Sequence, residues 1–134
     1  MAGRTIWRLV ALAALVAAVT GCAALAVGGA GAAAGVYLES RGASSVVEGT
    51  PSQVAQTTEQ VFADLGIRIT ERDYGDGDGG EIDIRGTNGD LDVDVDIEPQ
   101  SANTSKVHVE AKKNAFRWDQ DYARMVVERI VLAR

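Results

Sequence analysis

The sequence predicts a two-layer α+β domain, preceded by a signal or anchor helix, in which an antiparallel sheet of four to five strands carries two helices on one face in the order β-α-β-β-β-β-α. Three observations predict this fold. One segment has clear helix-start and helix-stop residues, the region after it alternates apolar with polar residues, and the chain closes on a second amphipathic helix. Apolar sheet faces and apolar helix stripes bury one another, so we expect the helices on one face and water on the other.

The first strand is expected within Val36 to Gly49, either long or broken, and a helix follows it. Thr50-Pro51-Ser52-Gln53 supplies an N-cap hydroxyl, a proline suited to the first turn and a glutamine that can complete a capping box. Gly66 is a typical helix stop. The residues at helical spacing between them are Val54, Thr58, Val61, Phe62 and Leu65.

After Gly66 the period changes to two, which indicates strands. The inward residues of the four expected strands are, in order along the chain, Ile67 and Ile69; Ile82 and Ile84; Leu91, Val93, Val95 and Ile97; and Val107, Val109 and Ala111. Asn88-Gly89 is expected to join the second and third of these strands as a tight turn, because both residues tolerate positive φ. Asp119 can cap the closing helix, whose apolar stripe contains Tyr122, Val126, Ile130 and Ala133.

The N-terminal segment is typical of a bacterial secretory signal. Arg4 and Arg8 precede an uncharged apolar run that ends in Val19-Thr20-Gly21-Cys22, which has the form of a lipobox. We therefore expect residues 1–21 to be removed and Cys22, the only cysteine, to carry a fatty acyl chain such as palmitate. Residues 22–35 would form a Gly/Ala-rich tether and 36–134 a periplasmic domain.

Two alternatives stay open for this segment. The run from Leu9 to Leu38 carries no charge before Glu39, so it could remain as an uncleaved membrane anchor. Its small residues, spaced by four, could also associate as a helix within the membrane rather than act as a tether. If the source is Gram-negative, Ala23 after Cys22 favours the outer membrane.

Charge excludes one class of partner. The formal net charge is −6, and loss of Arg4 and Arg8 with the leader changes it to −8. A markedly acidic domain repels phosphate backbones, so no nucleic acid partner is expected. Roughly 100 residues remain beyond the tether, enough for one core and not two.

The order of these features resembles an uncharacterised bacterial lipoprotein family, a domain of unknown function (DUF3568-like). The resemblance is carried by Cys22, the Gly/Ala-rich segment, the helix end Phe62-Ala63-Asp64-Leu65-Gly66-Ile67, the strand-rich middle and the closing helix with Val126 to Ile130. The Gly-rich stretch Asp76 to Gly80 and the Asp-rich third strand depart from the family pattern. The resemblance implies a fold and an envelope location, and it carries no activity or site residues.

An Asp-rich strand is the main candidate for a site. Asp90-Leu91-Asp92-Val93-Asp94-Val95-Asp96 places four carboxylates on one strand face at intervals of about 7 Å. If Asn88-Gly89 is a two-residue loop, Arg85 faces Asp92 and Asp83 faces Asp94. One register with the next strand sets Asp94 opposite His108, with Glu110 nearby.

The favoured interpretation of this face is a solvated charge ladder, in which Arg85, Lys106 and Lys112 offset the repulsion. The alternative is a weak divalent-cation site made by Asp83, Asp94 and His108. The Asp/Gly segment from Asp73 to Glu81 lacks EF-hand spacing and is interpreted as a connection between strands.

Lys112-Lys113-Asn114-Ala115-Phe116-Arg117-Trp118 mixes positive charge with two aromatic rings. The favoured interpretation is that Phe116 and Trp118 pack at the entry of the last helix, one of them as a hydrophobic staple before Asp119. The alternative is contact with anionic headgroups or peptidoglycan.

No catalytic motif is present: His108 is the only histidine, and neither a nucleophile elbow nor a phosphate-binding loop occurs. The sequence therefore predicts a non-enzymatic envelope lipoprotein without a cofactor, anchored in the membrane through Cys22 and facing the periplasm. It would act as a binding or structural module for an envelope protein or a cell-wall component. A cation-binding domain is the first alternative, and a carboxylate-dependent hydrolase is the second.

Overall fold

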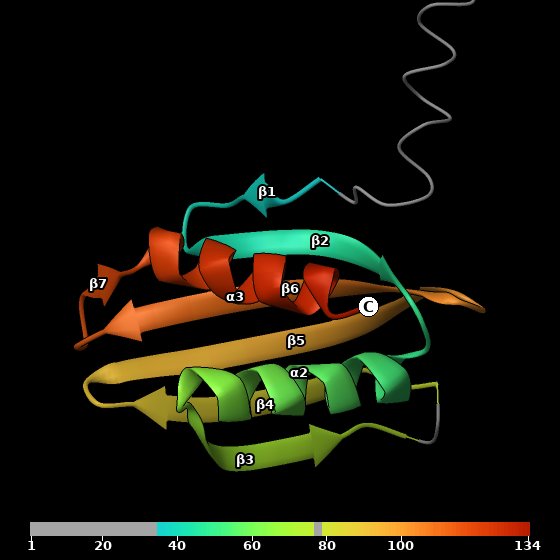
Figure 1. Cartoon of the computed structure of the whole chain (residues 1–134), viewed down its shortest axis with the longest axis horizontal. Helices are drawn as coiled ribbons and strands as arrows, with labels where there is room; N and C mark the ends of the chain where they lie inside the picture. Colours follow the sequence, from blue (N-terminus) through green and yellow to red (C-terminus); the bar gives the residue numbers. More distant parts are fainter. Residues whose placement is uncertain (1–34, 77–78) are drawn as a thin grey trace, which may run out of the picture. The chain divides into compact units, whose positions relative to one another are not determined.

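An antiparallel sheet of seven strands with two helices makes up the part of the chain that a computed structural model describes, residues 35–76 and 79–134 (Figure 1). The strands are β1 (Tyr37–Leu38), β2 (Gly42–Glu48), β3 (Arg68–Tyr74), β4 (Ile82–Asn88), β5 (Leu91–Ser101), β6 (Thr104–Lys113) and β7 (Arg117–Trp118), and the helices are α2 (Pro51–Leu65) and α3 (Gln120–Leu132). Gly35–Arg134 forms one compact unit. The predicted leader, Cys22 and the tether up to residue 34 lie outside the described residues.

The sheet order is β1-β2-β6-β5-β4-β3, and β7 pairs with β6. The α+β class is confirmed, but the expectation of four to five strands is too low for the described residues. The first expected strand is broken into the hairpin of β1 and β2, because Glu39 and Gly42 exchange backbone hydrogen bonds of 2.9 and 3.3 Å across the turn. This break adds one strand to the expected number. A second additional strand is β7, which has two residues and pairs with the end of β6.

Helix α2 begins and ends where its sequence predicts. The Thr50 hydroxyl accepts from the Gln53 amide at 3.4 Å, and the Gln53 side chain accepts from the Thr50 amide at 3.1 Å, which completes the capping box. Gly66 ends the helix with a left-handed φ of 70°. In α3 the Asp119 carboxylate accepts from the Tyr122 amide at 3.0 Å, so the predicted cap is confirmed there too.

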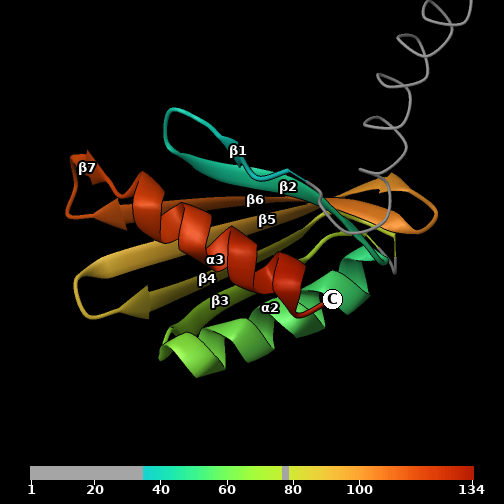
Figure 2. The ribbon, with the colours of Figure 1, turned by 45° about the horizontal axis from the view of Figure 1, so that its top comes forward.

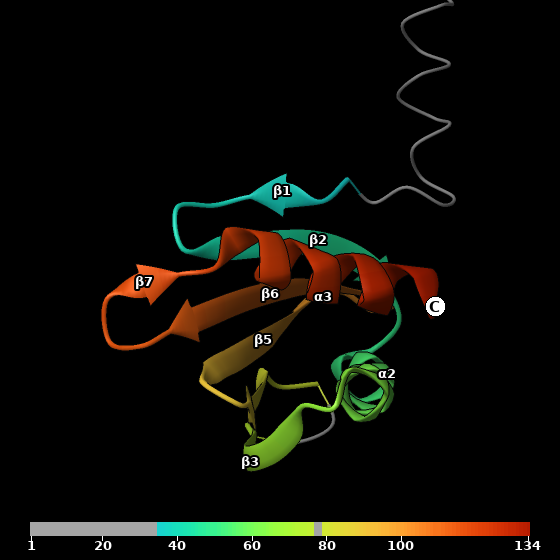
Figure 3. The ribbon, with the colours of Figure 1, turned by 60° about the vertical axis from the view of Figure 1, so that its left-hand side comes forward.

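Both helices cover the same face of the sheet (Figures 2 and 3). Helix α3 packs on β2 and β6, whereas α2 packs on β3, β4 and β5. Between the layers lies one apolar core, and the Val and Ile side chains of the central strands are almost fully buried in it. The largest fully buried apolar side chains are Phe62, Ile84, Ile97, Ile130, Val54, Val93, Val95, Val107, Val109, Val126 and Val127.

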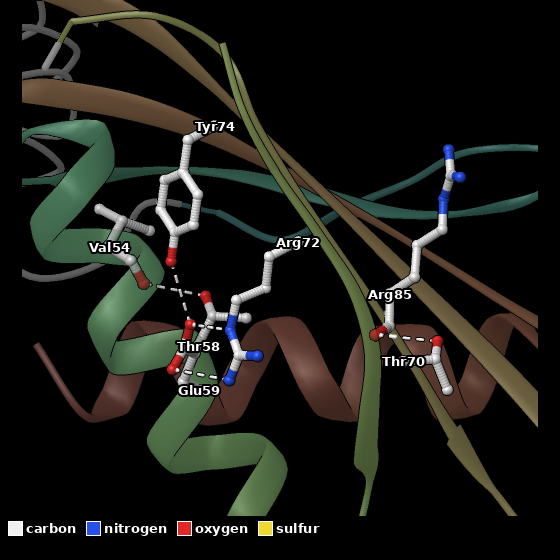
Figure 4. A network of polar contacts seen from close by, with 7 residues as sticks. All are labelled: Val54, Thr58, Glu59, Thr70, Arg72, Tyr74 and Arg85. Atoms are coloured by element: carbon white, nitrogen blue, oxygen red, sulfur yellow. Dashed lines mark hydrogen bonds and ion pairs between the residues drawn. The ribbon is translucent and has the colours of Figure 1, made fainter. Parts of the chain in front are cut away.

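The edge strand β3 is fastened to α2 by one carboxylate. Glu59 accepts from Arg72 at 2.7 and 3.3 Å and from the Tyr74 hydroxyl at 3.2 Å (Figure 4). The hydrogen bond from Arg72 is the main cause that lowers the pKa of Glu59. These bonds lie on the helix side of the sheet, so the opposite face is left to the charged side chains described below.

At Gly86 the sheet and α2 approach closely. A Cβ atom there would stand 2.6 Å from Ile67 Cγ2 and 3.0 Å from Phe62 Cε2. We expect Gly86→Ala to lower the free energy of unfolding by about 1–3 kcal/mol, because buried neighbours must shift. Gly79→Ala, where a Cβ would meet nothing within 4 Å, is the matched control. Urea denaturation measures both variants, and equal midpoints would contradict the close packing of this layer.

Candidate functional site

The sheet face opposite the helices carries charged side chains in rows that run across the strands. Residues paired in register point to the same face, so a row can be read from the strand pairing. The first row is Asp73, Asp83, Asp96, His108 and Ser44, and the second is Glu71, Arg85, Asp94 and Glu110.

The predicted register of this face is wrong by two residues on both sides of β5. Arg85 lies opposite Asp94 instead of Asp92, and Asp96, instead of Asp94, lies opposite both Asp83 and His108. On the β4 side the cause is the turn: Asn88 still pairs with Leu91, so the two loop residues are Gly89 and Asp90. On the β6 side the strands pair up to Ser101 and Thr104, with a register shift between Pro99 and Ser101.

Two contacts hold Asn88 inside β4. Its side-chain amide donates to the Leu65 carbonyl and to the Tyr122 hydroxyl, each at 3.2 Å. Gly89 then takes the first loop position with a φ of 64°. The signal that could have indicated this turn is Gly89-Asp90 itself, because glycine at the first loop position suits a type II′ hairpin.

In the second row Arg85 lies between two carboxylates. Its Nε donates to Asp94 Oδ1 at 2.9 Å and its Nη1 donates to Glu71 at 3.0 Å. Desolvation by burial raises the pKa of Asp94, and the hydrogen bond from Arg85 opposes that change. An arginine thus offsets carboxylate repulsion on this face, as the predicted charge ladder requires. The carboxylate opposite Arg85 is Asp94, however, and not Asp92.

In the first row three carboxylates follow one another, Asp73, Asp83 and Asp96, and no lysine or arginine of residues 35–76 and 79–134 forms an ion pair with them. Burial raises the pKa of Asp96 to about 7, and the hydrogen bond and the negative charge of Asp83 act in the same direction. A carboxyl with that pKa is partly protonated at neutral pH and can then donate a hydrogen bond to its partner.

His108 lies next to Asp96 in the first row and between two glutamates. Its Nε2 is 3.4 Å from Glu110 Oε1, and its Nδ1 is 3.5 Å from Glu39 Oε2. The Nδ1 atom is buried and has no hydrogen-bond partner among the described residues. Glu39 itself accepts from the Ser44 hydroxyl at 2.7 Å, which is the main cause that lowers its pKa.

The three predicted cation ligands are therefore not placed side by side. Asp83 and His108 lie in one row, whereas Asp94 lies in the next row with Arg85. Within residues 35–76 and 79–134, no group of three or more His, Cys, Asp or Glu side chains is arranged to hold a metal ion. Cation binding at Asp83, Asp94 and His108 stays a prediction. It was based on the three side chains lying side by side, and the strand pairing does not place them so.

The expected packing of the aromatic residues before α3 is also wrong. Phe116 is 95% exposed, and Trp118 lies outside the core cluster. The Trp118 ring instead has the Arg41 guanidinium 5.4 Å and the Lys112 ammonium 5.3 Å from its centroid. The segment turns at Asn114, whose positive φ of 62° directs the chain back along β6 before α3 begins.

These features define a small two-layer α+β domain with an open, charged sheet face. The chain belongs to the family described as Protein of unknown function (DUF3568), whose model matches residues 5–130. No curated protein matches the chain.

The Asp83–Asp96 pair predicts a pH-dependent stability. The folded-state pKa of Asp96, about 7, lies above the ordinary value of 3.8, so its contribution to stability is fully present below pH 3.8 and is lost as pH rises through about 7. We expect Asp96→Asn to raise the melting temperature by a few degrees near pH 8, because the neutral amide removes the repulsion.

Near pH 5 the same substitution should change the melting temperature much less, since the wild-type carboxyl is already protonated there. Asp92→Asn is the matched control, on the same strand and face but exposed and opposite Lys112. Thermal unfolding followed by circular dichroism gives both values. If Asp96→Asn raised the melting temperature equally at the two pH values, the raised pKa of Asp96 would be contradicted.

Proposed function

We propose that this protein is a membrane-anchored envelope lipoprotein whose folded unit acts as a non-enzymatic binding or structural module. The observation that carries the proposal is the position of Cys22. It closes an apolar leader, it is the only cysteine of the chain, and it precedes the compact unit that begins at Gly35 by a short Gly/Ala-rich stretch.

The form of the folded unit supports a binding role. Its open sheet face presents carboxylates and an arginine whose positions are fixed by ion pairs, with Arg85 held by Asp94 and Glu71. Fixed charges on an open face favour recognition of a complementary surface, because less side-chain freedom is lost on contact. In this proposal the partner is an envelope protein or a cell-wall component.

The described residues contain no helix that is both long enough and apolar enough to cross a bilayer.

Mass spectrometry of the protein from its native host tests the anchor. We expect a mature chain that begins at Cys22 and carries fatty acyl mass, and that partitions into the detergent phase. Cys22→Ser should abolish the added acyl mass, because the thiol is the acyl acceptor. Ala23→Ser is the matched control and should keep that mass. An intact leader with an unmodified thiol would contradict the proposal and favour the uncleaved anchor.

A further inference from the structure

An almost fully exposed phenylalanine stands at one end of the sheet. Phe116 lies in the turn between β6 and β7, and 95% of its surface is open to solvent. Phenylalanine is among the side chains most often buried, and its transfer out of water releases more free energy than that of most side chains. No described residue covers this ring, so it is available to an apolar environment outside the domain.

Four cations lie at the same end of the sheet as this ring. Lys112 and Lys113 end β6, Arg117 begins the β7 strand, and Arg41 lies in the β1–β2 turn at the same end of the sheet (Figures 1 and 2). Lys113 is 3.7 Å from Asp90. In the described part of the chain, no carboxylate lies within ion-pair distance of the other three cations. We call these four cations, with Phe116 and Trp118, the basic tip.

Trp118 fixes two of these cations in space. Its ring has Arg41 and Lys112 within 5.4 Å of the centroid, and the indole is only partly buried. Cation–π contacts hold the charged groups beside the aromatic ring without neutralising them. The tip therefore combines an exposed apolar ring, positive charges at the same end of the sheet and a tryptophan that contacts two of them.

This combination fits a lipid surface better than a folded partner. A single ring on an exposed turn needs a deformable apolar phase to enter, whereas a protein partner would have to supply a pocket of matching shape. Lysine, arginine and tryptophan are the residues that contact the headgroup level of a bilayer. The chain is acidic overall, so an anionic bilayer would attract this end of the domain and repel the carboxylate rows.

We propose that the basic tip docks on an anionic phospholipid surface, with Phe116 inserted among the acyl chains and the cations on the lipid phosphates. The tip belongs to the folded unit and not to the segment around Cys22. Binding of that unit alone thus tests this inference separately from acylation.

The experiment uses the unit Gly35–Arg134, which contains the whole described sheet, both helices and their core. Trp118 is its only tryptophan, since the other one in the chain is Trp7. Large vesicles of phosphatidylglycerol and phosphatidylcholine are compared with vesicles of phosphatidylcholine alone. We expect co-sedimentation and a blue-shifted Trp118 emission with the anionic vesicles only, weakening as salt is raised.

Two variants separate insertion from charge. Arg117→Glu removes one positive charge and adds a negative one, so at roughly fivefold per charge it should weaken binding about 25-fold. Phe116→Ser should weaken binding at least about fivefold through lost apolar burial. The matched controls are Arg68→Glu on β3 and Leu132→Ser at the end of α3, which is 80% exposed. Both should leave the affinity unchanged.

Three outcomes would overturn the proposal. The first is no binding to anionic vesicles, and the second is an equal loss in the control variants. The third is a loss with Arg117→Glu but none with Phe116→Ser, which would mean adsorption by charge without insertion. If soluble peptidoglycan fragments bind with the same dependence on Phe116 while vesicles do not, the tip is a cell-wall contact and not a lipid contact.

Discussion

The rest of the structure depends on the register of β5 between its two neighbours. Val93, Val95 and Ile97 are buried under the helices, so a slip by one residue would turn carboxylates into the core. The alternation therefore allows only shifts of two residues. On the β4 side Asn88 selects among them, because its amide reaches both the end of α2 at Leu65 and α3 at Tyr122.

That choice distributes the charges of the open face unevenly. With Arg85 opposite Asp94, the second row has its own cation, whereas Asp83 and Asp96 face each other between Asp73 on one side and His108 on the other. A carboxyl whose pKa rises to about 7 opposes folding at neutral pH, so the row costs stability that the apolar layer beneath it offsets.

Local chemistry made most of the fold predictable. The capping box at Thr50 and Gln53, the left-handed Gly66 and the period-two strands each act within a few residues, and each is confirmed. The register was not predictable in the same way. It depends on Asn88, Leu65 and Tyr122, which lie far apart in the sequence and meet only in the folded unit. The candidate cation ligands depended on that register, so the juxtaposition of Asp94 with Asp83 and His108 was wrong.

The short strand β7 was also beyond the sequence pattern, because two residues are too few to show a period. β1 has two residues as well, but it lies within the segment that was expected to form a long or broken first strand. The predicted packing of Phe116 against the last helix was wrong for a related reason. A hydrophobic staple requires the ring to point back at the helix, but the turn at Asn114 directs Phe116 outward.

The most direct test of the register is a solution measurement of cross-strand proximity. Nuclear Overhauser effects between backbone protons of labelled Gly35–Arg134 report which residues of β4 and β5 face each other. The structure predicts contacts from Asp83 to Asp96 and from Arg85 to Asp94. Contacts from Asp83 to Asp94 and from Arg85 to Asp92 would contradict it, and they would separate the two carboxylates on which the pH dependence rests.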